Sequence, residues 1–160
     1  MILDFFLADA QATERLAQAL ARSMPEHAVV HLHGQLGAGK STLARALLRE
    51  LGVTGPIKSP TYTLIERYPL AQGEAVHLDL YRIAEASELD FLGLDDLAAQ
   101  ARLWLVEWPE KGGSALPKAD LSIDLSVEGQ GRRARLRANA ETARDWLNRL
   151  SKIAVPGASS

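Results

Sequence analysis

The sequence contains no cysteine. Disulfide bonds and thiolate metal sites are therefore excluded, and nothing in the composition requires an oxidising compartment. A strong excess of either charge is also lacking, because 18 Lys and Arg residues stand against 20 Asp and Glu residues, for a net charge of −2. A protein with this balance has no overall attraction to nucleic acids or anionic lipids. Any polyanion must therefore bind to a local patch.

Long apolar runs are missing as well. No stretch approaches the roughly 20 apolar residues of a membrane-spanning helix, and no basic region precedes the apolar residues at the start of the chain. The length of 160 residues and the hydrophobic fraction of 47% are typical of one globular domain. We therefore expect a cytoplasmic protein with a single domain over 1–153, a flexible tail over 154–160, and no contact with membranes or DNA.

Glycines are concentrated in the stretch HLHGQLGAGKST at 31–42, which contains the pattern G-x-x-x-x-G-K-[ST] from Gly34 onward. Successive backbone N–H groups can surround a phosphate only where side chains do not intrude, and glycines leave that space open. In this pattern Lys40 can contact the β and γ phosphates, and the Ser41 hydroxyl can bind Mg²⁺. The residues expected to hold a nucleotide here are Gly34, Gly37, Ala38, Gly39, Lys40, Ser41 and Thr42.

The alternative is a glycine turn that binds nothing. The position of the stretch favours a phosphate-binding loop over such a turn, because it lies between a predicted strand and a predicted helix. Hydrophobic patterning predicts strands over 1–7, 27–34, 61–68, 74–79 and 101–107, and a hairpin over 121–138 that turns at 129–131. It predicts helices over 10–24, 40–51, 87–100 with an interruption at Gly93, and 140–150.

This alternation predicts an α/β fold of the P-loop NTPase type. We expect a mainly parallel sheet flanked by helices, with a C-terminal antiparallel hairpin.

Two acidic residues end predicted apolar strands. Asp79 follows AVHL, and Glu107 follows LWLV. Both are expected at the carboxyl edge of the sheet, where ligands bind in open α/β folds and where a carboxylate can reach Mg²⁺ directly or through water. An acid that ends a strand can also be an ordinary solvated terminus. The spacing does not divide the roles between the two.

Two loops bear on the nucleotide. Hydroxyls in the segment 59–62, including that of Thr61, could contact Mg²⁺ or a phosphate as in P-loop switch proteins, or the segment could be an ordinary proline turn. PKAD at 117–120 half resembles the guanine-binding N-K-x-D element, but Pro117 replaces the asparagine whose side-chain amide contacts the base. We therefore expect adenine rather than guanine.

Arginines alternate with small or apolar residues near the end of the chain. Arg133, Arg135 and Arg137 share one face of a predicted strand. That face could meet RNA phosphates, an acidic partner or the nucleotide, but a solvated strand face is the favoured interpretation.

Four ring side chains near the predicted site differ in their expected roles. His31 and His33 also share a strand face, and packing is favoured over a metal site because no cysteine or carboxylate lies close in sequence. Trp104 is expected in the core. Trp108, which follows Glu107, is expected at the edge of the site, where it could contact the nucleotide or a partner.

The segments GQLGAGKST, KSPTYTL, HLDLYR, LVEWPE and GQGRRARL together resemble the bacterial TsaE family, also called YjeE, over nearly the whole chain. The resemblance implies a small ATPase that uses ATP, ADP and Mg²⁺ and works with the proteins TsaB and TsaD. That system attaches a threonylcarbamoyl group to the adenosine adjoining the anticodon of tRNA. Contact with tRNA is expected only through the complex.

The resemblance also implies site residues. Ser41 and Glu107 would hold the metal, and Lys40, Asp79 and Glu107 would serve catalysis. The additional residues expected near the nucleotide are Thr13, Thr61, Trp108 and Arg132. Ser41 stands where the family often has threonine, and Arg133 where relatives can carry an acid, so Arg133 receives no shared role.

No catalytic base beyond the two acids is evident, so we expect slow hydrolysis by the protein alone. Two other functions remain open from the sequence. One is a P-loop kinase that phosphorylates a small acceptor, with the arginines after Gly131 as a lid. The other is a binding module that ATP switches.

Overall fold

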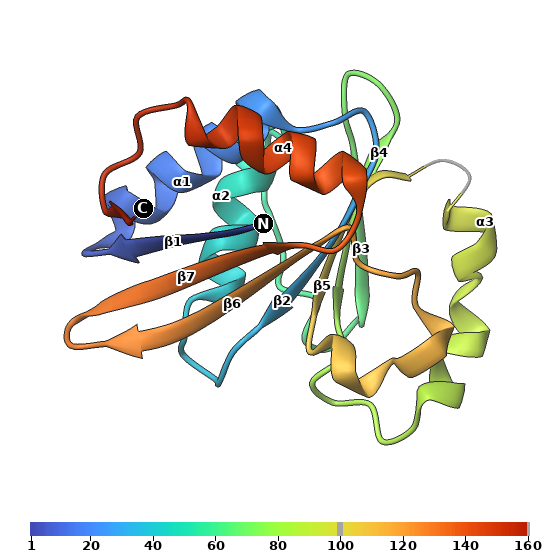
Figure 1. Cartoon of the computed structure of the whole chain (residues 1–160). Helices are drawn as coiled ribbons and strands as arrows, with labels where there is room; N and C mark the ends of the chain where they lie inside the picture. Colours follow the sequence, from blue (N-terminus) through green and yellow to red (C-terminus); the bar gives the residue numbers. More distant parts are fainter. Residues whose placement is uncertain (99–100, 160) are drawn as a thin grey trace.

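The computed structural model describes residues 1–98 and 101–159, and its strands form one sheet (Figure 1). In chain order the strands are β1 (Ile2–Leu7), β2 (Ala28–His33), β3 (Ile65–Pro69), β4 (Glu74–Asp79), β5 (Ala101–Glu107), β6 (Leu121–Glu128), β7 (Gly131–Ala138) and β8 (Ala158–Ser159). The α-helices are α1 (Ala10–Ser23), α2 (Lys40–Glu50), α3 (Leu94–Ala98) and α4 (Glu141–Ser151). Short 3₁₀ helices are η1 (Ala86–Leu92), η2 (Pro109–Lys111) and η3 (Gly113–Ala115).

The sheet has a parallel centre and antiparallel flanks. Its strand order is β3-β4-β5-β2-β6-β7-β1-β8, in which β4, β5, β2 and β6 are parallel neighbours. The other neighbouring pairs are antiparallel, including the β6–β7 hairpin. The predicted α/β architecture with its C-terminal hairpin is therefore confirmed. The antiparallel pairings of β1 with β7 and of β3 with β4 were not predicted.

Two apolar clusters cover opposite faces of the sheet. In Figure 1, α1, α2 and α4 lie together on one side, while α3 lies on the other. The larger cluster includes Trp146 of α4, whose indole N–H donates to the Leu20 carbonyl of α1 at 3.1 Å. The smaller cluster joins Val76 and Trp104 to Leu89 of η1, so the prediction of a core role for Trp104 is confirmed. Side chains alternate along β5, which is why one strand feeds both clusters.

Several element boundaries differ from the predicted ones. Residues 61–64 form a turn, in which the Leu64 amide donates to the Pro60 carbonyl at 2.8 Å, and β3 begins only at Ile65. The helix predicted over 87–100 is instead η1 and α3, separated at Gly93, and residues 99 and 100 lie outside the described part. Among the described residues, no helix is both long and apolar enough to cross a membrane.

The C-terminus also differs from the predicted flexible tail. Val155 is buried, Ala158 pairs with Phe5 of β1, and the Phe6 amide donates to the Gly157 carbonyl at 2.8 Å. Without β8, β1 would be an edge strand with unpaired N–H and C=O groups on its outer side, and such an edge accepts another strand. Figure 1 shows the C-terminal segment returning to β1.

Candidate functional site

Three parallel strands end at one edge of the sheet and carry the predicted site residues there. The glycine loop follows β2, Asp79 ends β4 and Glu107 ends β5. Parallel pairing sets Asp79 beside Glu107, and Glu107 beside Leu32 of β2. The two predicted acids, 28 positions apart in the sequence, are therefore neighbours in space.

Each glycine of the loop has its own structural reason. Gly34 has φ +147°, and a Cβ there would meet the Leu125 carbonyl oxygen at 2.5 Å, so the loop can pass β6 only with glycine at this position. Gly37 and Gly39 have φ of +81° and +103°, which L side chains rarely adopt. The loop then enters α2 at Lys40, where free backbone N–H groups and the helix dipole favour an anion.

A cavity of about 520 Å³ lies at this edge of the sheet. Most of the predicted nucleotide and metal residues line it: Thr13, Gly37, Ala38, Gly39, Lys40, Ser41, Thr42, Thr61, Asp79, Glu107, Trp108 and Arg132. Gly34 is absent from this lining; its role is to let the loop pass close to Leu125 of β6. Lining residues that the sequence did not suggest are Leu7, Ala8, Asp9, Ala10, Leu36, Tyr81, Leu125, Gln130 and Gly131.

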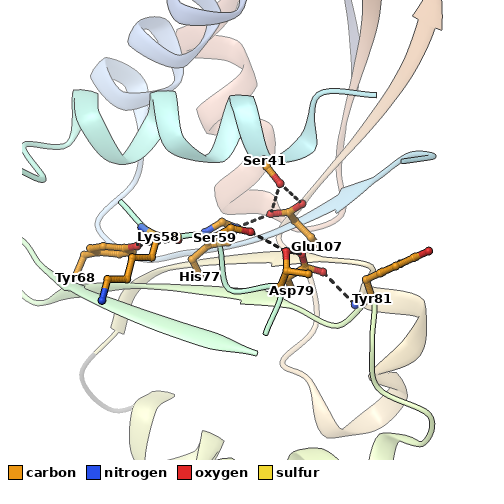
Figure 2. Close-up of polar contacts among 9 residues, drawn as sticks. Ser41, Lys58, Ser59, Tyr68, His77, Asp79, Tyr81 and Glu107 are labelled. Atoms are coloured by element: carbon orange, nitrogen blue, oxygen red, sulfur yellow. Dashed lines mark hydrogen bonds and ion pairs between the residues drawn. The ribbon is translucent and has the colours of Figure 1, made fainter. Parts of the chain in front are cut away.

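Ser41 and Glu107 meet at the floor of the cavity (Figure 2). The Ser41 hydroxyl lies 2.9 Å from Oε1 and 3.2 Å from Oε2 of Glu107. Glu107 is only 2% exposed, and a carboxylate so far from water needs donors or a cation beside it. The first turn of α2 supplies one such donor.

Asp79 ties a neighbouring loop to the same site. Its Oδ2 accepts a hydrogen bond from the Thr61 hydroxyl at 3.2 Å, and its Oδ1 accepts one from the Tyr81 amide at 3.0 Å. The Thr61 hydroxyl also lies 2.7 Å from that of Ser59. The segment predicted as switch-like or as a plain turn is therefore a turn in which the Thr61 hydroxyl contacts the acid at the end of β4.

Lys40 is held by the loop that it closes. Its ammonium donates to the carbonyls of Gly34 and Gln35, the latter at 3.0 Å, and lies 4.5 Å from the centroid of the Trp108 ring. Burial lowers the pKa of Lys40 below its ordinary value, and the negative charges of Glu107 and Asp79 partly offset that effect. A partly desolvated cation facing an open cavity is suited to binding an anion.

Trp108, predicted at the edge of the site, lines the cavity. It is one of two non-glycine residues with positive φ among the described residues, at φ +57° and ψ +49°. Such a conformation costs roughly 1–3 kcal/mol. Here the indole lies against the Lys40 ammonium, and its ring centroid is 5.1 Å from that of Tyr81. The next residue, Pro109, begins η2.

Arg132 reaches the loop from the hairpin. Its guanidinium donates to the Gly37 carbonyl from two nitrogens, at 3.0 and 3.2 Å. The neighbouring Arg133 lies on the opposite face of β7 and pairs with Glu128 at 2.8 Å. Of these two adjacent arginines, Arg132 is the one that lines the cavity.

The sequence also missed His77, which is not among the residues that line the cavity but contacts Glu107. His77 is 1% exposed, and its Nε2 lies 2.6 Å from Oε2 of Glu107. A histidine inside the apolar run AVHL, two positions before Asp79, was the available signal. Its partner lies on β5, 30 positions later in the chain, and that contact depends on the register between the strands.

The remaining singled-out residues have partners outside the cavity. Arg135 pairs with Asp4 and Arg137 with Asp124, so both are neutralised as on a solvated strand face. His31 Nε2 lies 3.2 Å from the Pro117 carbonyl oxygen, and His33 lies 3.6 Å from Glu110.

The side chains at the cavity that could bind a metal ion offer oxygen atoms. Hydroxyl and carboxylate oxygens, as on Ser41 and Glu107, are the ligands that Mg²⁺ prefers. In residues 1–98 and 101–159 no three His, Cys, Asp or Glu side chains are grouped to hold a metal by themselves. Mg²⁺ usually keeps several waters and takes substrate phosphate oxygens as ligands, so a site with few protein ligands beside a phosphate loop fits it.

Comparison with known proteins agrees with this geometry. Residues 7–135 match the family model described as "Threonylcarbamoyl adenosine biosynthesis protein TsaE". The chain belongs to the TsaE family. The matched region contains the glycine loop, both acids and Arg132, so the cavity lies within the part that defines the family.

Individual relatives cover most of the chain. The TsaE protein of Haemophilus influenzae is 38% identical over 139 residues, which are 86% of this chain and 88% of that protein. The TsaE protein of Synechocystis is 39% identical over 113 residues, 68% of this chain and 71% of its own. A crystal structure of Bacillus subtilis YdiB superposes with a TM-score of 0.79 at 25% identity, and the match covers 95% of each chain. The fold is thus shared with this structure along nearly its whole length.

Proposed function

We propose that this TsaE-family protein is a Mg²⁺-dependent ATPase that supports tRNA threonylcarbamoyladenosine biosynthesis together with TsaB and TsaD. The observation that carries the proposal is the meeting of Ser41 and Glu107 beneath a phosphate loop, with 2.9 Å between hydroxyl and carboxylate. A buried acid at that point can hold Mg²⁺ and can also orient a water at the γ phosphate. The buried carboxylate suggests chemistry at the γ phosphate.

Binding is assigned to the loop and its helix. The backbone N–H groups of 34–42 would surround the phosphates, and Lys40 would exchange its loop carbonyls for the β and γ oxygens. Mg²⁺, when bound, would neutralise charge on those oxygens, with Ser41 and Glu107 as its protein ligands. Thr13 and Trp108 line the same cavity and would lie near the nucleoside.

Hydrolysis is assigned to the two acids. Glu107 would orient the attacking water, and Asp79, held by Thr61 and the Tyr81 amide, would fix the loop over the same space. Positioning and charge neutralisation do most of the work in phosphoryl transfer. The one further carboxylate among the described residues that line the cavity, Asp9, caps α1 by accepting from the Ala12 amide. The protein alone should therefore turn over slowly, and TsaB and TsaD would complete or couple the site.

Contact with tRNA would come through the complex. The arginine row that could have met RNA is paired with carboxylates, at 2.8 Å for Arg133, 3.0 Å for Arg135 and 2.9 Å for Arg137. A neutralised row releases few counterions and gains little from a nucleic-acid backbone.

The test is phosphate release from ATP and Mg²⁺, measured with the protein alone and during titration with TsaB and TsaD. We expect turnover to rise on adding the partners; an equal rate throughout the titration would exclude coupling. Glu107→Gln should lower turnover at least about a hundredfold while the dissociation constant for ATP changes little.

Glu110→Gln is the matched control. Glu110 is the next glutamate in the chain, exposed and 3.6 Å from His33, and it lies outside the cavity lining. This variant should keep the parental rate. If Glu107→Gln stops hydrolysis but the tRNA modification continues at full rate, ATP serves only as a binding switch and the ATPase role is wrong.

A further inference from the structure

His77 is a buried polar residue for which the proposed mechanism has no use. It lies on β4 between two bonded strands, opposite Glu66 of β3 and Leu105 of β5, and is 1% exposed. Burying an imidazole in an apolar strand costs free energy unless it is hydrogen-bonded. Its one side-chain hydrogen bond in the described part of the chain is with Glu107.

The two ring nitrogens of His77 differ sharply in their surroundings. Nε2 lies 2.6 Å from Oε2 of Glu107, which is a short hydrogen bond to a carboxylate oxygen. Nδ1 is buried and has no hydrogen-bond partner among the described residues. A buried N–H without an acceptor is expensive, and a carboxylate accepts only. The proton of a neutral imidazole therefore belongs on Nε2.

We propose that His77 is the positioning residue for Glu107. By donating its Nε2 proton to Oε2, it fixes the rotation of the carboxylate about its last bond, so that Oε1 faces Ser41 and the cavity. The inference rests on the proposed function, in which Glu107 serves Mg²⁺ and the attacking water.

His77 is suited to this role because its place does not depend on ligands. Ser41 also contacts Glu107, but its hydroxyl sits in the first turn of α2, where the proposed function gives it a second task at Mg²⁺. His77 is held by strand pairing on both sides. It remains a donor to Glu107 whatever Ser41 does, and a carboxylate with one fixed oxygen is preorganised for what the other must bind.

The first test needs no nucleotide. A long-range ¹H–¹⁵N correlation spectrum of the imidazoles, with His77 assigned by the His77→Gln variant, should show a proton on Nε2. Glu107→Gln should move the Nε2 resonance of His77 and leave those of His27 unchanged, since His27 lies outside the site. A bare Nε2, with the proton on Nδ1 alone, would overturn the proposal.

The second test is kinetic and uses substitutions matched in size. His77→Gln places an amide N–H near the position of Nε2, whereas His77→Asn is also polar but one carbon too short, and His77→Leu has no donor. We expect kcat to fall roughly ten- to hundredfold in the Leu and Asn variants and to be largely restored in the Gln variant, with KM for ATP within about threefold throughout.

Equal losses in the Gln and Asn variants, or no loss in Leu, would contradict the positioning role. Thermal unfolding of each variant identifies any that fails to fold, and the Gln and Asn pair still decides the question if Leu does. In a Glu107→Gln background, His77→Asn should lower kcat no further, because the group it positions is gone.

The two proposals can fail separately. If the parent protein neither binds nor hydrolyses ATP, the proposed function is wrong, while the spectrum still decides whether His77 holds Glu107. If the parent hydrolyses ATP and the spectrum shows a bare Nε2, only the inference on His77 fails.

Discussion

The Thr61 hydroxyl donates to the carboxylate of Asp79 across 3.2 Å, which joins the loop after α2 to the end of β4. Thr61→Val keeps the shape and removes that donor. We expect the Leu64 amide, which closes the same turn on Pro60, to exchange with solvent at least about threefold faster. Hydrogen exchange followed by NMR measures this directly.

Thr63→Val is the control for that change. Thr63 lies in the same turn but is exposed and bonds to Glu66 instead of Asp79. Its substitution should leave exchange at Leu64 close to the parental rate. If both variants behave alike, the link to Asp79 does not hold the loop.

Comparing variants of Arg132 and Arg133 distinguishes a specific contact with the nucleotide from a general effect of positive charge on ATP affinity. Arg132→Ala removes two donors from the Gly37 carbonyl and a cation from the cavity rim, so the affinity for ATP should fall about tenfold. Arg133→Ala removes the same charge from the far face of β7, and the change there should stay below about twofold. Calorimetric titration of both variants at one salt concentration measures the two affinities, and equal losses would count against a specific role for Arg132.

Gly157 tests the attachment of the C-terminal segment. It has φ +85°, and an added Cβ would collide with the Phe6 carbonyl oxygen. Gly157→Ala should therefore release β8, and the Phe6 amide should lose its protection from exchange. Gly55→Ala is the matched control, because Gly55 has φ +79° but nothing lies within 4 Å of an added Cβ. This variant should introduce the same backbone strain and leave the protection of the Phe6 amide unchanged. Unchanged protection of Phe6 in Gly157→Ala would show that the segment is not paired there.

His31 gives the protein a pH dependence of stability. Burial lowers the pKa of His31 below its ordinary value of 6.5, and the hydrogen bond to the Pro117 carbonyl only partly offsets this. Between the lowered folded pKa and 6.5, the unfolded chain binds the proton and the folded protein does not, so stability falls as the pH drops through this window. Urea unfolding at several pH values should show a shallower loss for His31→Gln than for the parent. Parallel curves would exclude the effect.

Much of the fold follows from local pattern. The predicted strand before the glycine loop, the helix from Lys40 and the hairpin at 129–131 are all confirmed. Each could be predicted because the hydrophobic pattern and the glycines that define it lie within the segment itself. The pairing of β1 with β7 and β8 could not be read in the same way. It joins Phe5 to Ala134 and to Ala158, and such long-range partners depend on the packing of the whole sheet.

The candidate site shows the same division. Lys40, Asp79 and Glu107 stand at motif positions and strand ends, and the structure brings them to one cavity. His77 was missed because a histidine within an apolar strand has no local feature that names its partner. Its contact with Glu107 arises only when β4 and β5 pair in the observed register.

The most direct test of the central claim is calorimetric titration of the protein with ATP and Mg²⁺, beside the Lys40→Ala variant. We predict a saturable heat for the parent and an affinity at least about tenfold weaker for the variant, since the Lys40 ammonium lies where the loop enters α2 and would contact the phosphates directly. No heat from the parent, or identical curves for the two proteins, would contradict it.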